Sequence, residues 1–283
     1  MTLRRFLNST LALLLVALFA LLSGCATSPY DAKNKAPSDQ LLWQQIEQAE
    51  QALSGSTKPR LIFAGFAMNS QSKAFRGDVE LAERRVRSVD SEAVVFKLSN
   101  PVFGQEADWP YATRENMIRV FEAIAKYARP QDKVILLLST HGNVNLLSIN
   151  AAQKEYAAWT GKQLRQALNG LTKQPMWIIV SACHAGSLIP ALSQPNWLIS
   201  AAAAKDRISF GCQFNGKQTY FVDGLLGDGW STEASMQNLF ARAKLRVAER
   251  ERAERLSPPS SPQLFVGESA RVWAEIPLTN WRD

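Results

Sequence analysis

Short apolar runs alternate with helical stretches along most of this chain, and this alternation constrains the fold more than any other feature. The β-prone runs occupy residues 60–64, 93–98, 133–139, 176–181 and 197–201. Helical periodicity between them predicts helices at about 79–88, 113–128 and 161–171. Strands that alternate with helices indicate an α/β fold with a largely parallel sheet. The runs VILLL and MWIIV are apolar throughout, as expected of strands buried on both faces.

Further elements are predicted at both ends of this pattern. Ser38 and Asp39 are typical helix caps and predict a helix that runs from there to about Ser54, before Gly55. Four short strands are expected at residues 207–212, 219–222, 263–266 and 271–276, and a long helix at 231–256.

The N-terminus has the features of an export signal. Arg4 and Arg5 precede an apolar run at 11–22, which suits a signal peptide and is short for a membrane-spanning helix. The sequence LSGC resembles the lipobox of bacterial lipoproteins, which implies cleavage before Cys25 and its lipidation; an uncleaved leader would also tether the chain. Ala26, rather than Asp, implies the outer membrane, facing the periplasm. Three parts are expected: a signal peptide at 1–24, a lipidated tether with a helix at 25–57, and one large domain at 58–283.

The charge pattern argues against one class of partner. The formal net charge is +7, but basic residues are scattered and many neighbour acids, as in the ERER run at 249–252. Such a pattern is typical of a solvated helix face, so no nucleic-acid partner is expected. The chain has no C-x-x-C pair, and its two histidines lie far apart in sequence, so no metal site is predicted. No motif indicates an organic cofactor.

A histidine and a cysteine each follow a predicted strand. His141 follows the run VILLLST, and Cys183 follows WIIVSA. Ligands of parallel sheets bind at the carboxyl ends of the strands, so both side chains are expected at one edge. If the two strands are neighbours, about 4.8 Å apart, the side chains can approach each other. An imidazole there can take the thiol proton, stabilise the nucleophilic thiolate and later protonate a leaving amine.

Small residues beside this pair suit the same chemistry. Gly142 lets a substrate carbonyl approach the backbone, and the N–H groups of Gly142 and Cys183 are candidates for an oxyanion hole. A helix that starts at Gly186 and Ser187 would favour the thiolate through its positive end.

Simpler interpretations of the same residues remain open. Cys183 at a strand end can be a core residue, and His141 can be a structural one. An exported compartment also permits a disulfide between Cys183 and Cys212, which would abolish a nucleophile at Cys183. His184 is a poor alternative base, because adjacent side chains usually point apart.

At these residues the chain resembles a known family. THG at 140–142 and SACHAGS at 181–187 are similar to the legumain-like (C13) cysteine peptidases, which include the catalytic subunit of the GPI transamidase. The resemblance implies a caspase-like, three-layer α/β/α fold with a mostly parallel central sheet, over roughly residues 60–267. It also implies cleavage of peptide or protein substrates by a Cys183–His141 dyad. Residues 58–283 would then be the catalytic domain.

The same resemblance implies a substrate pocket, with some departures. Arg76, Ser209 and Asp223 would line the pocket for the residue before the cut, which the resemblance implies to be Asn or Asp. The legumain type has Glu two residues before the nucleophile, where this chain has Ser181. The family's Asn that orients the histidine has no clean counterpart here, because Ala67 falls at that position.

Three functions are consistent with these residues. The first is a lipid-anchored cysteine endopeptidase of the bacterial cell envelope, which forms an acyl-enzyme and hydrolyses it. The second is a transamidase that passes the same acyl group to an amine. The third is a scaffold that keeps the fold without catalysis.

Overall fold

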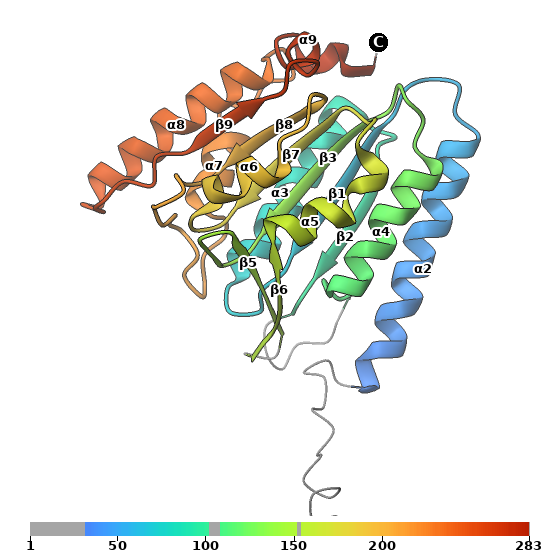
Figure 1. The fold of residues 1–283 in the computed structure, drawn as a ribbon, viewed down its shortest axis with the longest axis horizontal. Helices are drawn as coiled ribbons and strands as arrows, with labels where there is room; N and C mark the ends of the chain where they lie inside the picture. The colour runs from blue at the N-terminus through green and yellow to red at the C-terminus, as the bar shows by residue number, and fades with distance from the viewer. Residues whose placement is uncertain (1–31, 102–107, 152–153, 283) are drawn as a thin grey trace, which may run out of the picture.

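A mixed, mostly parallel sheet forms the centre of the molecule. The computed structural model describes residues 32–101, 108–151 and 154–282. The strand order is β2-β1-β3-β7-β8-β9 (Figure 1). The strands are β1 (Leu61–Ala67), β2 (Val94–Ser99), β3 (Lys133–Ser139), β7 (Met176–Ser181), β8 (Trp197–Ala201) and β9 (Gln263–Val266). All neighbours pair in parallel except β9, which is antiparallel to β8. The predicted sheet is therefore confirmed.

Helices cover both faces of this sheet, so the fold has three layers (Figure 1). One face carries α2 (Ala32–Ser54), α4 (Arg114–Tyr127), α5 (Gly161–Ala167) and α6 (Ile189–Leu192). The other carries α3 (Lys73–Val89), α7 (Tyr220–Leu226) and α8 (Met236–Ala253). Side chains of β1 alternate between the two cores: Ile62 and Phe66 pack on the first face, Leu61 and Phe63 on the second. The predicted α/β/α architecture is confirmed.

A second, antiparallel sheet was not predicted. It consists of β4 (Gly142–Asn143), β5 (Leu146–Ala151) and β6 (Lys154–Thr160). The turn between β4 and β5 includes Asn145, whose φ of 57° is left-handed, a conformation that Asn tolerates. Figure 1 shows β5 and β6 extending below the large sheet, beyond the carboxyl ends of its parallel strands. The hairpin therefore lies at the edge where the sequence predicts a site.

Three of the strands predicted in the second half of the chain are not strands in the structure. Residues 207–212 have no regular structure, and 219–222 begin α7, because the Thr219 hydroxyl accepts a hydrogen bond from Val222 N. Residues 271–276 begin as helix α9 (Arg271–Ala274). The helical turn buries Trp273 against Trp281, with ring centroids 5.1 Å apart, and Trp281 Nε1 donates to the Trp273 carbonyl. Tertiary contacts thus override the local β-propensity of these segments.

The first helix begins earlier than its sequence indicates. Helix α2 starts at Ala32 and contains Pro37, so the expected cap at Ser38 is wrong, although the end at Ser54 is confirmed. The Ser38 hydroxyl instead accepts a hydrogen bond from Tyr111 N at 2.9 Å. The predicted signal peptide and Cys25 lie outside the described residues. None of the described helices has the length and apolar character needed to cross a membrane.

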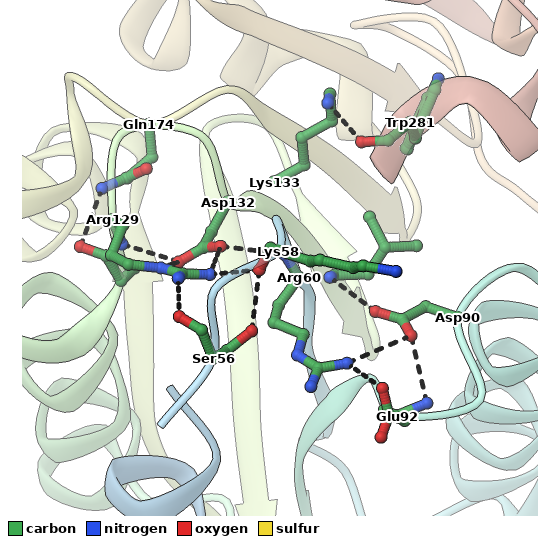
Figure 2. Close-up of polar contacts among 12 residues, drawn as sticks. Ser56, Lys58, Arg60, Asp90, Glu92, Arg129, Asp132, Lys133, Gln174 and Trp281 are labelled. Carbon is green, nitrogen blue, oxygen red and sulfur yellow. Dashed lines mark hydrogen bonds and ion pairs between the residues drawn. The ribbon is translucent and has the colours of Figure 1, made fainter. Parts of the chain in front are cut away.

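Buried carboxylates secure the edge of the sheet opposite the site (Figure 2). Asp132 accepts hydrogen bonds from Arg60 N at 2.9 Å and from the Arg129 guanidinium at 2.8 Å. Asp90 accepts one from Leu61 N at 3.1 Å. Figure 2 also shows Arg129 reaching the segment that joins α2 to β1. These contacts hold the starts of β1 and β3 in place. The sheet is therefore a fixed scaffold for the loops at its opposite, carboxyl edge.

Candidate active site

Strands β3 and β7 are neighbours, as the sequence analysis assumed. They pair in parallel register up to Ser139 and Ser181, and Thr140 N donates to the Ser181 carbonyl at 3.1 Å. The two chain segments remain in contact beyond the ends of the strands, at Gly142. A Cβ atom at that position would lie 2.6 Å from the carbonyl oxygen of Cys183, closer than side chains are found. The segments that carry His141 and Cys183 therefore run side by side, and only glycine fits at residue 142.

The thiol of Cys183 lies against the backbone of the 207–209 segment. Cys183 is half-buried and not in a disulfide. Its Sγ accepts a hydrogen bond from Ser209 N at 3.4 Å, with the Ser209 hydroxyl at 3.9 Å and the Ser209 carbonyl at 3.6 Å. In the thiol form, the sulfur can in turn donate to the Ser209 carbonyl. Ser209 was expected to line a substrate pocket; in the structure it contacts the sulfur itself.

The backbone turns sharply immediately after Cys183. His184 has a φ of 55°, and its N–H donates to the Arg207 carbonyl at 2.7 Å. Left-handed conformations of non-glycine residues are uncommon and concentrate at functional sites. The imidazole Nδ1 of His184 lies 3.2 Å from the Lys205 carbonyl, so this ring is engaged by another loop. Among the described residues, no acceptor pairs with the Cys183 amide.

The helix expected after Cys183 is short. A 3-10 turn at Ala185–Leu188 precedes α6, which has four residues. The macrodipole of such short segments is weaker than that of a long helix. The backbone N–H of Ser209 is therefore the nearer hydrogen-bond donor to the sulfur.

His141 packs edge-on against an aromatic ring of helix α3. The centroids of the His141 and Phe75 rings are 5.1 Å apart, at 87°. Burial lowers the pKa of His141 below its ordinary value of 6.5. The imidazole is consequently neutral at pH 7 and able to accept a proton. Within the described part of the chain, no side chain forms a hydrogen bond to this ring; Asn69 Oδ1 accepts Gln71 N instead.

Asp78 is a buried acid of the site region that the sequence analysis missed. Its side chain is fully buried in α3 and accepts hydrogen bonds from Ser139 Oγ at 2.6 Å, Thr219 N at 2.9 Å and Thr219 Oγ1 at 2.9 Å; Ser181 Oγ lies 3.4 Å away. Burial raises the pKa of Asp78 to about 7, against the hydrogen bonds, which lower it. A signal was present, because Asp78 falls on the apolar face of its helix with Phe75 and Val79.

The three expected pocket residues lie in different places. Arg76 forms ion pairs with Glu80 at 2.9 Å and with Asp108 at 2.6 Å, and these carboxylates raise its pKa. Its guanidinium also lies 4.1 Å from the centre of the Trp109 ring. Asp223, in α7, forms its ion pair with Arg250 at 3.6 Å. Arg76 and Asp223, which were expected to line one pocket, therefore line two different cavities.

Arg76 lines one of these cavities. The volume is about 390 Å³, and the lining comes from the ends of β1 and β2, the first turns of α3 and residues 215–218. Lys73, Asn69 and Asn100 add polar groups to the lining, so the cavity suits a polar side chain. In the described residues, no three His, Cys, Asp or Glu side chains gather as a metal ion would require.

Comparisons with known proteins fit this geometry. A sequence model described as the peptidase C13 family matches residues 118–266, which include His141 and Cys183. Among solved structures, caspase-1 from Spodoptera frugiperda is similar, with a TM-score of 0.51, 13% sequence identity, and coverage of 74% of this chain and 86% of that chain. At this identity the likeness shows the fold alone, and it confirms the predicted caspase-like architecture. A search of curated proteins found no match.

Proposed function

Since the chain belongs to the peptidase C13 family, we propose that it is a cysteine endopeptidase with Cys183 as nucleophile and His141 as its proton acceptor. One observation carries the proposal. The segments that carry the two residues leave neighbouring strands and touch where Gly142 meets the Cys183 carbonyl. The lowered pKa of His141 also supports it, because a neutral imidazole can take the thiol proton at pH 7.

The proposed reaction has two stages. In the first, the Cys183 proton passes to His141, the sulfur bonds to the scissile carbonyl carbon, and the carbon–nitrogen bond then breaks as His141 protonates the leaving amine. In the second, His141 takes a proton from water, the hydroxyl bonds to the thioester carbon, and the carbon–sulfur bond breaks. The acid is released, and the thiol regains its proton.

The transition state places negative charge on the substrate carbonyl oxygen. The amide of Cys183 and that of Gly142 are the proposed donors to this oxygen. The Cys183 amide supports this role, since no described residue accepts its hydrogen bond. The amide of Ser209, directed at the sulfur, would hold it in position before attack.

We extend the proposal to substrates with Asn or Asp before the cut. Arg76, which lines the 390 Å³ cavity, and Ser209, which contacts the sulfur, are the residues proposed to contact such substrates. The amide of Asn offers both an acceptor and donors to the polar lining. Asp223 is left out because its ion pair with Arg250 holds it elsewhere.

A peptide panel tests the proposal. Peptides that differ only in Asn, Asp or Ala at one position are incubated with the protein, and the products are identified by mass spectrometry. Cleavage is expected after Asn or Asp, with the acid-side fall of kcat/KM displaced to lower pH than an exposed histidine would give, because burial lowers the pKa of His141. Addition of a primary amine separates the two acyl acceptors: only hydrolysed product supports the peptidase, and amide product would instead support a transamidase. Equal cleavage after all three residues would contradict the substrate assignment.

The proposal also includes a membrane anchor at Cys25. The lipobox-like LSGC supports lipidation there, at the outer membrane and facing the periplasm. Replacement of Cys25 with serine is expected to prevent incorporation of labelled fatty acid, because the thiol that would carry the lipid is absent, even if an uncleaved leader still tethers the chain. Incorporation of labelled fatty acid by the variant would rule out a lipid on Cys25.

A further inference from the structure

The carboxyl group of Asp78 joins the three chain segments that form the site. Ser139 Oγ, two residues before His141, donates to Asp78 Oδ2 at 2.6 Å. Ser181 Oγ, two residues before Cys183, lies 3.4 Å from the same oxygen. Thr219, which ends the loop that carries Ser209, donates from both its backbone and its hydroxyl at 2.9 Å. The Asp78 side chain is thus hydrogen-bonded to the start or end of each of the three segments.

The position of Asp78 is costly for the fold. The carboxyl is fully buried, and its partners are hydroxyl groups and one amide rather than a cation. Burial of a charge without a counter-ion is unfavourable, and this is why its pKa rises to about 7. Three hydroxyl groups that converge on one oxygen, with a further contact of 2.8 Å between Ser181 and Thr219, fix a single arrangement. An apolar residue at 78 would pack on the same helix face without that cost.

Asp78 is not a third member of a catalytic triad. Burial is the cause of the lowered pKa of His141. The described contacts of the His141 ring are with Phe75, not with the carboxyl. Any influence of Asp78 on the dyad must therefore pass through the positions of the strand ends.

We propose that Asp78 is a positioning residue that holds the ends of β3 and β7 and the start of α7 together, so that His141 reaches the sulfur of Cys183. This inference rests on the proposed function for the roles of the two residues. If this inference is right, a carboxyl group supplied from a different residue at the same place should also hold the segments together. Ser181 Oγ is within 3.4 Å of Asp78 Oδ2, so an aspartate at 181 would bring a carboxyl group to the same place from the opposite side.

The test measures how fast iodoacetamide alkylates Cys183 in the folded full-length protein at pH 7.5, with peptide mapping to isolate that thiol. Asp78→Asn keeps the shape of the side chain and is expected to slow alkylation about 10- to 100-fold, the cost of a misplaced reacting group. Asp78→Asn with Ser181→Asp is expected to recover most of the rate. Asp132→Asn, which alters a fully buried aspartate at the opposite edge, is the matched control and should leave the rate unchanged.

A second comparison separates positioning from general damage. In a His141→Ala background, Asp78→Asn is expected to cause no further loss, because the two residues act through one step. A full additional loss there, no loss from Asp78→Asn alone, or no recovery with Ser181→Asp would overturn the proposal.

If Asp78→Asn does not fold, Ser139→Ala removes one donor and keeps the carboxyl; a partial loss would support positioning, and an unchanged rate would refute it.

Alkylation does not require peptide cleavage. If the wild-type protein cleaves no peptide but its alkylation depends on His141 and Asp78 as described, the proposed function fails and the positioning role stands. If peptides are cleaved but the substitutions behave independently, the positioning role fails alone.

Discussion

Replacement of Cys183 with alanine is expected to lower kcat/KM for peptide cleavage by at least about 10³-fold, the scale on which loss of a nucleophile acts in hydrolases. The reason is chemical: without the sulfur, no thioester forms, and the proton acceptor His141 has no partner to activate. The measurement is the initial rate with the best peptide of the panel, at substrate concentrations below KM.

Cys212 offers a matched control for that substitution. It is the other half-buried free cysteine of the described residues. Burial, and to a smaller extent Cys183, raises the pKa of its thiol, so it is poorly reactive. Cys212→Ala should retain cleavage activity. If activity survived in Cys183→Ala but disappeared in Cys212→Ala, the nucleophile would be Cys212 and the proposal would be wrong.

Replacement of Gly77 with alanine is expected to destabilise the protein, against the usual trend for helices. An alanine inside a helix is ordinarily about 1 kcal/mol better than glycine. At Gly77, however, the new Cβ would lie 1.8 Å from the backbone carbonyl oxygen of Lys217. That segment cannot easily withdraw, because Lys73 N donates to the Phe214 carbonyl and Ser72 Oγ to the Gln213 carbonyl.

The clash should outweigh the helix propensity. Overpacking costs about 1–3 kcal/mol or more, so a net loss of about 2 kcal/mol in the free energy of unfolding is expected. A loss of that size lowers Tm by roughly 4–8 °C in a domain of this size, which thermal unfolding followed by circular dichroism can measure. Gly55→Ala is the control, because its nearest neighbour, Gln51 O, would be at an ordinary 3.5 Å. A Gly77→Ala protein as stable as the Gly55→Ala protein would show that residues 213–218 yield freely.

The strands of the large sheet could be predicted from local pattern alone. Three of them, β3, β7 and β8, begin and end at the residues that the sequence indicates. Each is buried along its whole length or nearly so, so almost every side chain in the run is apolar. The short elements after residue 206 could not be predicted in this way. Their conformation depends on what they pack against: Thr219 on Asp78, and Trp273 on Trp281.

Some features of the candidate site could likewise be predicted from the sequence, and others could not. That His141 and Cys183 lie at one sheet edge follows from the parallel direction of the strands, which the alternation of strands and helices indicates; that the two strands are neighbours is known only from the structure. The role of Asp78 does not follow, because its partners Ser139 and Ser181 are 61 and 103 positions away in the chain. From the sequence, Ser181 looked like the loss of an acid; in the folded protein a carboxyl from α3 lies beside it.

The chain's own pattern of apolar and polar residues thus determined the parallel sheet, the burial of its strands on both faces and the edge that carries His141 and Cys183. These features depend on burial, which each segment records locally through its periodicity. Only the tertiary structure decided which groups surround these two residues: Ser209 on the sulfur, Phe75 on the imidazole, and Asp78 beside the ends of both strands. Those contacts join residues from separate elements, and their energies depend on distances that no local pattern encodes.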